Sequence, residues 1–310
     1  MSIRIGTRGS ALALWQAHHV EKKLQAAGYA TEIVTIETKG DKILDVSIAK
    51  IGSKGVFTEE IETQLEKGQI DIAVHSAKDM QSTLPDGFRL IAFMAREKPN
   101  DVIISHKAGI RLGNDTPFVL GTSSTRRVAT LKHLHPHIET TPVRGNLQTR
   151  IRKMKEGACD ALLLAYAGVH RMGYEDMICE ELSTQEFIPA VGQGSVAIEV
   201  HSSLSQEKSE GIRAILNHEA TESCLLAERS FLKEVDGGCS IPVFALAKLH
   251  ENTITIEGGI ISLDGSEKRV RKFSGESNTA VDLGRQLAEE VLSSGGERIL
   301  KEIKNNINET

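Results

Sequence analysis

The sequence is poor in aromatic residues and has no excess of positive charge. Phe, Trp and Tyr make up 4% of the 310 residues, which leaves few rings on which nucleic-acid bases could stack. Lys and Arg number 37 against 42 Asp and Glu, so the formal net charge is −5. We therefore do not expect a broad surface for nucleic acid.

Long apolar segments and closely spaced cysteines are also absent. No window is long and apolar enough to cross a bilayer, and the first residues, MSIRIGTRGSALALW, lack the basic stretch and apolar run of a signal peptide. The four cysteines, at positions 159, 179, 224 and 239, show neither CxxC nor Cys/His ligand spacing. We expect a cytoplasmic protein with reduced thiols and without a disulfide or a metal site.

The first part of the chain alternates between strand-like and helix-like segments. Short apolar runs at 3–7, 32–37 and 70–75 are typical of buried strands. Ser10 and Thr58 stand where the N-terminal caps of two intervening helices are expected. This alternation predicts an α/β layer structure.

A second block of the same kind follows the polar segment 96–101. Its expected strands and helices cover residues 101–106, 118–122, 125–134, 138–143, 146–157 and 160–168. Segment 187–194 is predicted to lead the chain back, so that 195–200 adds a strand to the first block. Two crossings between two α/β lobes predict a hinged cleft in which loop ends converge on a ligand.

The order of expected helices and strands changes near Asn217. A helix at 218–235, strands at 253–262 and 267–276 and an amphipathic helix at 280–296 predict a small α+β domain. The predicted fold is thus of the α/β class with three domains. Their expected boundaries are 1–97 with 194–214, 98–193, and 215–310.

Arginines gather at the expected ends of these elements. Those at or beside such ends are Arg8, Arg126, Arg127, Arg144, Arg150 and Arg171. In GTSSTRR, residues 121–127, small hydroxyl residues before a helix offer backbone N–H groups to an anion, and the paired guanidiniums add bidentate contacts. A single arginine there is usually a solvated charge. Several on one framework favour a ligand with several negative groups, either a polycarboxylate or a polyphosphate.

Two glycine-containing segments are weak signals for a nucleotide. IGSKGVF, residues 51–57, does not match the phosphate-binding motif G-x-x-x-x-G-K-[ST]. VGQGSVAI, residues 191–198, lacks the third glycine of a dinucleotide-binding fingerprint. Neither segment predicts a nucleotide site by itself.

Lys78 and Asp79 belong to HSAKD, residues 75–79, the segment that follows the apolar run IDIAV. Open α/β sheets place ligand groups just beyond the carboxyl ends of their strands. The two residues could equally form a local charge pair in a turn. If the reaction develops positive charge, a desolvated Asp79 carboxylate would suit it.

Cys239 follows two glycines in EVDGGCSIP, residues 234–242. Cysteine is often a small hydrophobic residue of the core, so the residue pattern alone favours a buried thiol. It also leaves open a nucleophilic thiol, although His218 and His250, the closest histidines in sequence, are not near it.

Eight segments, in this order, resemble the porphobilinogen deaminase family, whose members are also called hydroxymethylbilane synthases. They are TRGSALALWQ, KGDKILD, AKIGSKGVF, DIAVHSAKD, LGTSSTRR, PVRGNLQTR, PAVGQGSVAIE and GGCSIP. Each is modest alone, but together they span nearly the whole chain. The resemblance implies two lobes like those of type II periplasmic binding proteins and a third domain that carries Cys239.

The resemblance also implies an activity. Family members couple four porphobilinogen molecules head to tail, with loss of ammonia at each step, to give hydroxymethylbilane. They do so on a dipyrromethane cofactor joined to the enzyme through a cysteine thioether, which by position is Cys239. Each porphobilinogen unit carries an acetate and a propionate. The resemblance therefore implies that the arginines bind a polycarboxylate. A monomer is expected.

The resemblance assigns roles residue by residue. Asp79 matches the catalytic aspartate, which stabilises the cation formed as ammonia leaves. Cofactor contacts fall on Ser10, Lys78, Asp79, Thr122, Ser124, Arg126, Arg127, Arg144 and Cys239. Substrate contacts fall on Arg8, Ser10, Lys50, Lys54, Phe57, Arg144, Arg150 and Arg171.

The chain departs from the family pattern at two places. Met80-Gln81 stands where Val-Pro is usual, so a less rigid turn is expected after Asp79. Ser195 replaces a common alanine. Two other classes of function stay open from the residues alone: a non-catalytic protein that binds an organic polyanion, and a cysteine hydrolase using Cys239.

Overall fold

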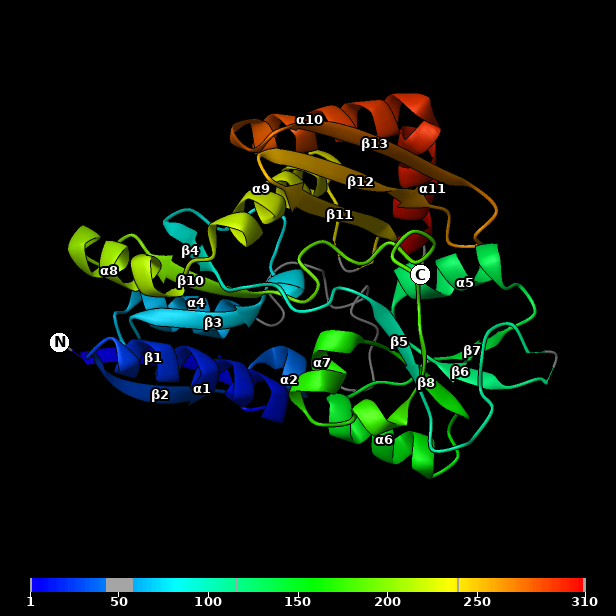
Figure 1. Cartoon of the computed structure of the whole chain (residues 1–310), viewed down its shortest axis with the longest axis horizontal. Coiled ribbons are helices and arrows are strands. Elements are labelled where there is room, and N and C mark those ends of the chain that lie inside the picture. Colours follow the sequence, from blue (N-terminus) through cyan, green and yellow to red (C-terminus); the bar gives the residue numbers. More distant parts are fainter. Residues whose placement is uncertain (1, 43–57, 115, 239, 309–310) are drawn as a thin grey trace.

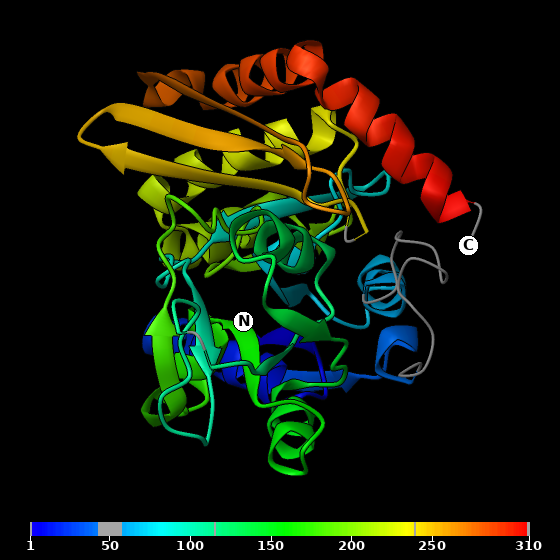
Figure 2. The same cartoon turned by 90° about the vertical axis from the view of Figure 1, so that its right-hand side faces the viewer.

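The computed structural model describes residues 2–42, 58–114, 116–238 and 240–308. Three sheets organise these residues, two with five strands and one with three. Figure 1 shows the first sheet and its helices beside the second, with the third sheet above both. Figure 2, which is seen from the right-hand side of Figure 1, again shows the third sheet above the other two. Helix α11, in red, runs downward from this upper part.

The first sheet has the strand order β2-β1-β3-β10-β4. Strand β1 pairs in parallel with β2 and β3, whereas β10 is antiparallel to β3 and β4. Its elements are β1 (Ser2–Arg8), α1 (Ala11–Ala26), β2 (Ala30–Ile36), α2 (Lys39–Lys42), α4 (Glu59–Glu66), β3 (Ile72–Ser76), the 3-10 turn η1 (Ala77–Asp79), β4 (Phe88–Phe93), β10 (Val196–His201) and α8 (Gln206–Leu216). The predicted return of the chain is confirmed, because β10 lies inside this sheet.

The second sheet has the order β7-β6-β8-β5-β9. Strand β6 is parallel to β7 and β8, and β5 is antiparallel to β8 and β9. Its elements are β5 (Asp101–Ile104), β6 (Val119–Gly121), α5 (Thr125–Leu134), β7 (Glu139–Thr141), α6 (Leu147–Lys155), β8 (Ala161–Ala165), α7 (Tyr166–Arg171), η2 (Glu175–Met177) and β9 (Ile178–Glu181). Both sheets place the carboxyl ends of their parallel strands next to predicted site residues.

The third sheet is an antiparallel meander covered by helices. Its elements are α9 (Glu219–Glu234), β11 (Val243–His250), β12 (Thr253–Ile261), β13 (Lys268–Glu276), η3 (Ser277–Thr279), α10 (Ala280–Val291), η4 (Leu292–Gly296) and α11 (Glu297–Asn308). Helices α9 and α10 pack closely, because a Cβ on Gly284 would come within 2.1 Å of the Ala227 carbonyl oxygen. The predicted α/β lobes and the α+β C-terminal part are confirmed, whereas the exact domain boundaries stay a prediction.

Some local predictions were wrong or incomplete. The Thr58 hydroxyl does not cap α4; it accepts a hydrogen bond from Gln81 Nε2 at 3.0 Å instead. A contact 23 residues away thus competes with the local cap. The α-helices and strands that were not predicted are α2, β4, α8, β9, β11 and α11. In α11 the signal was present, because Ile299, Leu300 and Ile303 lie on one helical face and are buried.

Candidate active site

The turn η1 places Lys78 and Asp79 directly after β3. Ala77 is buried, and its backbone N–H donates to the Ser195 carbonyl at 2.9 Å. Gly192 has φ +75°, and a Cβ there would lie 2.9 Å from the backbone carbon of Ala77. A glycine is therefore needed for the second crossing, residues 187–194, to lie against η1. This packing leaves Lys78 half-buried and Asp79 exposed.

The GTSST turn leads from β6 into α5 as predicted. Ser124 occupies the N-cap, where its hydroxyl accepts from the Arg127 backbone N–H at 3.5 Å. The Thr122 hydroxyl accepts from the Ser124 N–H at 3.3 Å, and the Thr122 N–H donates to Thr141. The turn therefore satisfies several of its own backbone donors while it orients the two arginines that follow.

Arg126 and Arg127 are buried, at 5% and 6% relative exposure. Both contact Asp101, which is fully buried at the start of β5. Arg126 Nη2 lies 2.8 Å from one carboxylate oxygen, and Arg127 Nη2 lies 2.7 Å from the other. Asp101 was not among the predicted site residues, although its place as the last residue of the predicted crossing 96–101 was an available signal.

Lys78, Asp79 and the arginines influence each other across the two lobes. Burial first, and then the Arg127 charge, lower the pKa of Lys78 to about 8, while Asp79 and Asp101 act in the opposite direction. Burial and Arg127 likewise lower the pKa of Arg150 to about 10, and Asp79 again opposes this. Residues from η1, α5 and α6 therefore share one electrostatic site.

Arg150 and Arg144 lie around the N-terminus of α6. Arg150 Nε donates to the Gly145 carbonyl at 2.7 Å, and the Arg144 charge lowers the pKa of Arg150 further. Asn146 caps the helix by accepting from Thr149 N–H at 2.9 Å. The structure thus brings these two predicted arginines to the same site as Arg127.

Arg171 lies in a different region, where α7 meets α1. Its Nη2 donates to the Gly194 carbonyl at 2.7 Å, and its guanidinium lies 5.3 Å from the centre of the Trp15 ring. Ser10 caps α1 by accepting from Ala13 N–H at 3.3 Å, and Arg8 is the last residue of β1. Arg8, Ser10 and Arg171 therefore lie near α1 and not beside Arg126 and Arg127.

Four predicted site residues lie outside the described residues: Lys50, Lys54, Phe57 and Cys239. Their assignments come from the resemblance alone.

The segment after η1 is fixed although it lacks the usual proline. Met80 has φ −75° and ψ 140°, the extended conformation that a residue before proline adopts. Its side chain is buried with Ala77 and Leu225. Arg229 Nη2 donates to the Gln81 carbonyl at 2.8 Å, and the Gln81 side chain reaches Thr58. Side-chain contacts therefore hold the turn where the family uses a proline ring.

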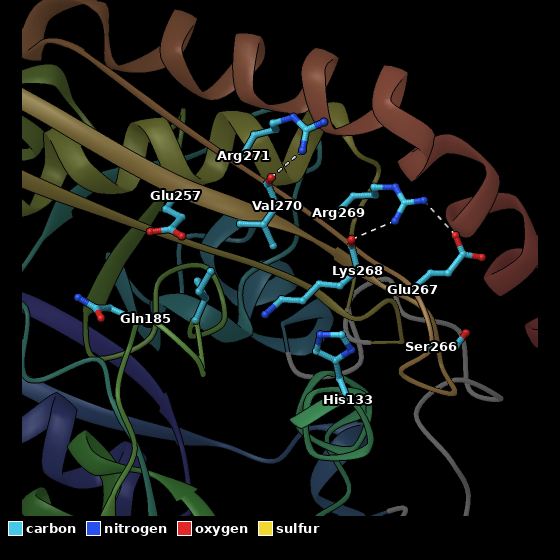
Figure 3. Close-up of a pocket in the computed structure, with 10 residues that line it drawn as sticks. His133, Gln185, Glu257, Ser266, Glu267, Lys268, Arg269, Val270 and Arg271 are labelled. Atoms are coloured by element: carbon cyan, nitrogen blue, oxygen red, sulfur yellow. Dashed lines mark hydrogen bonds and ion pairs between the residues drawn. The ribbon is translucent and has the colours of Figure 1, made fainter. Parts of the chain in front are cut away.

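A separate groove of about 650 Å³ lies between the end of α5 and the hairpin of β12 and β13. Figure 3 shows His133 on α5 below Lys268 on β13. His133 Nδ1 lies 2.8 Å from the Gly265 carbonyl oxygen, and Lys268 Nζ lies 5.5 Å from the Phe244 ring centre. None of the predicted site residues that the structure describes lines this groove.

Comparison with known proteins decides the family. Residues 3–209 match the family model "Porphobilinogen deaminase, dipyromethane cofactor binding domain", and residues 222–293 match "Porphobilinogen deaminase, C-terminal domain". The chain belongs to the porphobilinogen deaminase family. The porphobilinogen deaminase of Desulfosudis oleivorans is 54% identical over 98% of both chains. That of Cytophaga hutchinsonii is 54% identical over 100% of this chain and 99% of its own.

Membership of the porphobilinogen deaminase family confirms the resemblance and the activity that it implies. The protein is a transferase that makes hydroxymethylbilane from porphobilinogen in tetrapyrrole biosynthesis and has a dipyrromethane cofactor-binding domain. The alternatives of a reversible binding protein and of a cysteine hydrolase are thereby set aside.

Solved structures add little to this result. The periplasmic VFT2 domain of Bordetella pertussis BvgS has a TM-score of 0.41 at 12% identity, over 69% of this chain and 92% of that domain. A likeness this weak supports no argument. Within the described part of the chain, no helix is both long and apolar enough to span a membrane.

Proposed function

We propose that the cleft between the two lobes holds the dipyrromethane cofactor and the growing pyrrole chain through their carboxylates. Five cations interact there: Lys78, Arg126, Arg127, Arg144 and Arg150. Only two carboxylates, Asp79 and Asp101, oppose them, so three positive charges are left for a ligand. This excess carries the proposal.

The chemistry of the donors fits a polycarboxylate. Arg126 is buried, yet its Nε has no hydrogen-bond partner among the described residues. A buried N–H donor without a partner is costly, so a carboxylate oxygen that accepted from it would stabilise the site. The acetate and propionate of each pyrrole supply such acceptors, and Ser10, Thr122, Ser124, Arg8, Arg144 and Arg171 extend the proposed contacts.

We infer that the cofactor is attached through Cys239. The three cysteines that the structure describes are free thiols, and Cys159 and Cys224 are buried. Burial raises the pKa of all three, that of Cys224 to about 11, so they are poor nucleophiles. The family motif GGCSIP leaves Cys239 as the position for the thioether.

Intact mass spectrometry under denaturing conditions tests this attachment. The wild-type chain should carry the mass of a dipyrromethane, located on the Cys239 peptide after digestion. Cys239→Ser should carry no added mass and should not turn over, whereas Cys179→Ser, the matched control, should keep both. A Cys239→Ser protein with normal turnover would refute the attachment.

The exposed Asp79 carboxylate is assigned the catalytic role. As the bond between carbon and the leaving amine breaks, positive charge develops on the porphobilinogen that releases ammonia. A carboxylate held beside Lys78 at the end of η1 can stabilise that charge and accept a hydrogen bond from the pyrrole N–H. Lys50, Lys54 and Phe57 are proposed to contact the same substrate.

We further propose that the enzyme works in the cytoplasm as a monomer. Its domains are proposed to divide at 1–97 with 194–214, 98–193, and 215–310. A gel-filtration mass matching the 33.8 kDa chain would support the monomer.

A further inference from the structure

Asp101 lies where the two crossings and the arginine pair meet. It ends the first crossing, residues 96–101, is the first residue of β5 and is fully buried. One carboxylate oxygen accepts from Arg127 Nε at 3.1 Å and Nη2 at 2.7 Å. The same oxygen accepts from Gln193 Nε2, on the second crossing, at 2.9 Å. The other oxygen faces Arg126 Nη2 at 2.8 Å.

Each guanidinium is fixed from a second side by a backbone carbonyl. Arg126 Nη1 donates to Ile188 at 3.0 Å, and Arg127 Nη1 donates to Leu163 at 2.9 Å. Because two anchors define the plane of a guanidinium, Asp101 and these carbonyls set the directions in which the remaining N–H groups point. The buried Arg126 Nε is the donor left without a partner among the described residues.

Charge gives Asp101 a second effect. One carboxylate between two buried guanidiniums balances one of their two charges, so the pair keeps a net positive charge while its mutual repulsion is reduced. The carboxylate also acts on Lys78, together with Asp79, against the charges of Arg126 and Arg127.

We propose that Asp101 is the positioning residue of the arginine pair: it orients both guanidiniums toward the carboxylates of the bound pyrroles and ties that orientation to both crossings. This inference rests on the proposed ligand-binding role of Arg126 and Arg127. Asp101 itself contacts no ligand; it acts through the two arginines.

The test compares full-length wild type, Asp101→Asn and the control Asp71→Asn. Asp71 is also an ion-paired carboxylate, bound to Arg4 and Lys208, but it lies at the opposite end of β3. Asp101→Asn should reduce the fraction of molecules carrying the dipyrromethane mass by roughly tenfold or more. Asp71→Asn should leave this fraction unchanged.

A second readout separates positioning from a purely structural role. The pKa of Lys78, followed by NMR after isotopic methylation of the lysines and assigned with Lys78→Arg, should fall in Asp101→Asn because a neighbouring negative charge is lost. It should not move in Asp71→Asn. Either wild-type loading or an unchanged Lys78 pKa in Asp101→Asn would overturn the inference.

Three further variants keep the outcome decisive. If Asp101→Asn does not fold, Asp101→Glu replaces it, because glutamate keeps the charge but shifts it by one methylene. Asp101→Glu should keep the Lys78 pKa and still load poorly. Full loading of Asp101→Glu would overturn the inference. If Arg126→Gln and Arg127→Gln both load fully, the proposed function of the pair is wrong. If they load poorly but Asp101→Asn loads fully, only the role of Asp101 is wrong.

Discussion

Lys78 and Asp79 are neighbours in sequence but meet different surroundings at the end of β3. The charges of Arg126, Arg127 and Asp101 act on the ammonium of Lys78, whereas Asp79 is exposed. Burial makes a charged lysine costly, so its pKa falls to about 8, while the exposed carboxylate is free to meet a substrate. One short turn thus supplies a titratable cation and an accessible anion.

The lowered pKa of Lys78 predicts a pH dependence of ligand binding. Above about pH 8 this lysine loses its charge, so the affinity for porphobilinogen should fall. Lys78→Arg should remove this alkaline decline, because arginine stays charged. Measuring KM from pH 7 to 9 checks both statements, and an alkaline decline that persists in Lys78→Arg would assign it to another group.

Stability should respond to the same group with the opposite sign. Between about pH 8 and the ordinary value of 10.5, the unfolded chain binds more protons at Lys78 than the folded chain does. The contribution of this group to the free energy of unfolding therefore rises with pH. Weaker binding at alkaline pH would then not be a sign of unfolding.

Asp79→Asn should separate binding from chemistry. The amide keeps the size of the side chain but cannot neutralise a developing positive charge, so kcat should fall by about a hundredfold or more while the cofactor mass is retained. Single-turnover kinetics with intact-mass detection measures both. A near-normal kcat would show that Asp79 is not the catalytic residue. Asp86→Asn, on an exposed loop, serves as the control.

At the scale of elements, η1 is held by three neighbours. The second crossing packs on Ala77, α4 contacts Gln81 through Thr58, and Arg229 of α9 donates to the Gln81 carbonyl. These contacts explain how Met80-Gln81 can replace Val-Pro without loss of the turn.

Gln81→Ala should therefore lower the free energy of unfolding by about 1–2 kcal/mol, because it removes a part-buried hydrogen bond to Thr58. Gln81→Pro should cost less, since Met80 already has the conformation required before proline. Urea unfolding measures both, with Gln206→Ala, which loses an exposed hydrogen bond to Glu210, as control. A larger loss in Gln81→Pro than in Gln81→Ala would contradict this account of the turn.

At the scale of the molecule, Glu228 of α9 connects the third domain to both crossings. Its carboxylate pairs with Arg96 on the first crossing and accepts from Gly192 N–H on the second at 2.8 Å. It also accepts from Ala247 N–H of β11 at 2.8 Å. A fully buried carboxylate with these partners makes the three sheets depend on one another.

Trp15 gives a probe of how the lobes meet. It is the only tryptophan in the sequence, 37% exposed, and Arg171 of the second lobe covers its ring. Arg171→Leu should remove the cation–π contact and change the emission of Trp15, while Arg285→Leu on the exposed face of α10 should not. Identical spectra for all three proteins would mean that Arg171 does not cover Trp15 in solution.

The local patterns that predicted the fold were those with strong periodicity or clear caps. Helix α5 was predicted with its observed bounds, because Ser124 precedes a run without glycine or proline. Strand β11 was missed because its first five residues, VFALA, are all buried, and a short continuous apolar run has no period that distinguishes a strand from a helix. The structure brings Arg126, Arg127, Arg144 and Arg150 together, and their contacts with a ligand stay a prediction. The prediction treated Arg126 and Arg127 as available charges, whereas both are paired with Asp101.

The sequence by itself determined the alternation of strands and helices, the return of the chain at 195–200, and, through eight ordered motifs, the family and its reaction. Only the tertiary structure decided which charges are already paired. The contacts of Asp101 with Arg126 and Arg127 join residues 25 and 26 positions apart, and Gln193 is 92 positions away. No local pattern encodes such distances; they exist because two crossings bring separate strands to one buried point.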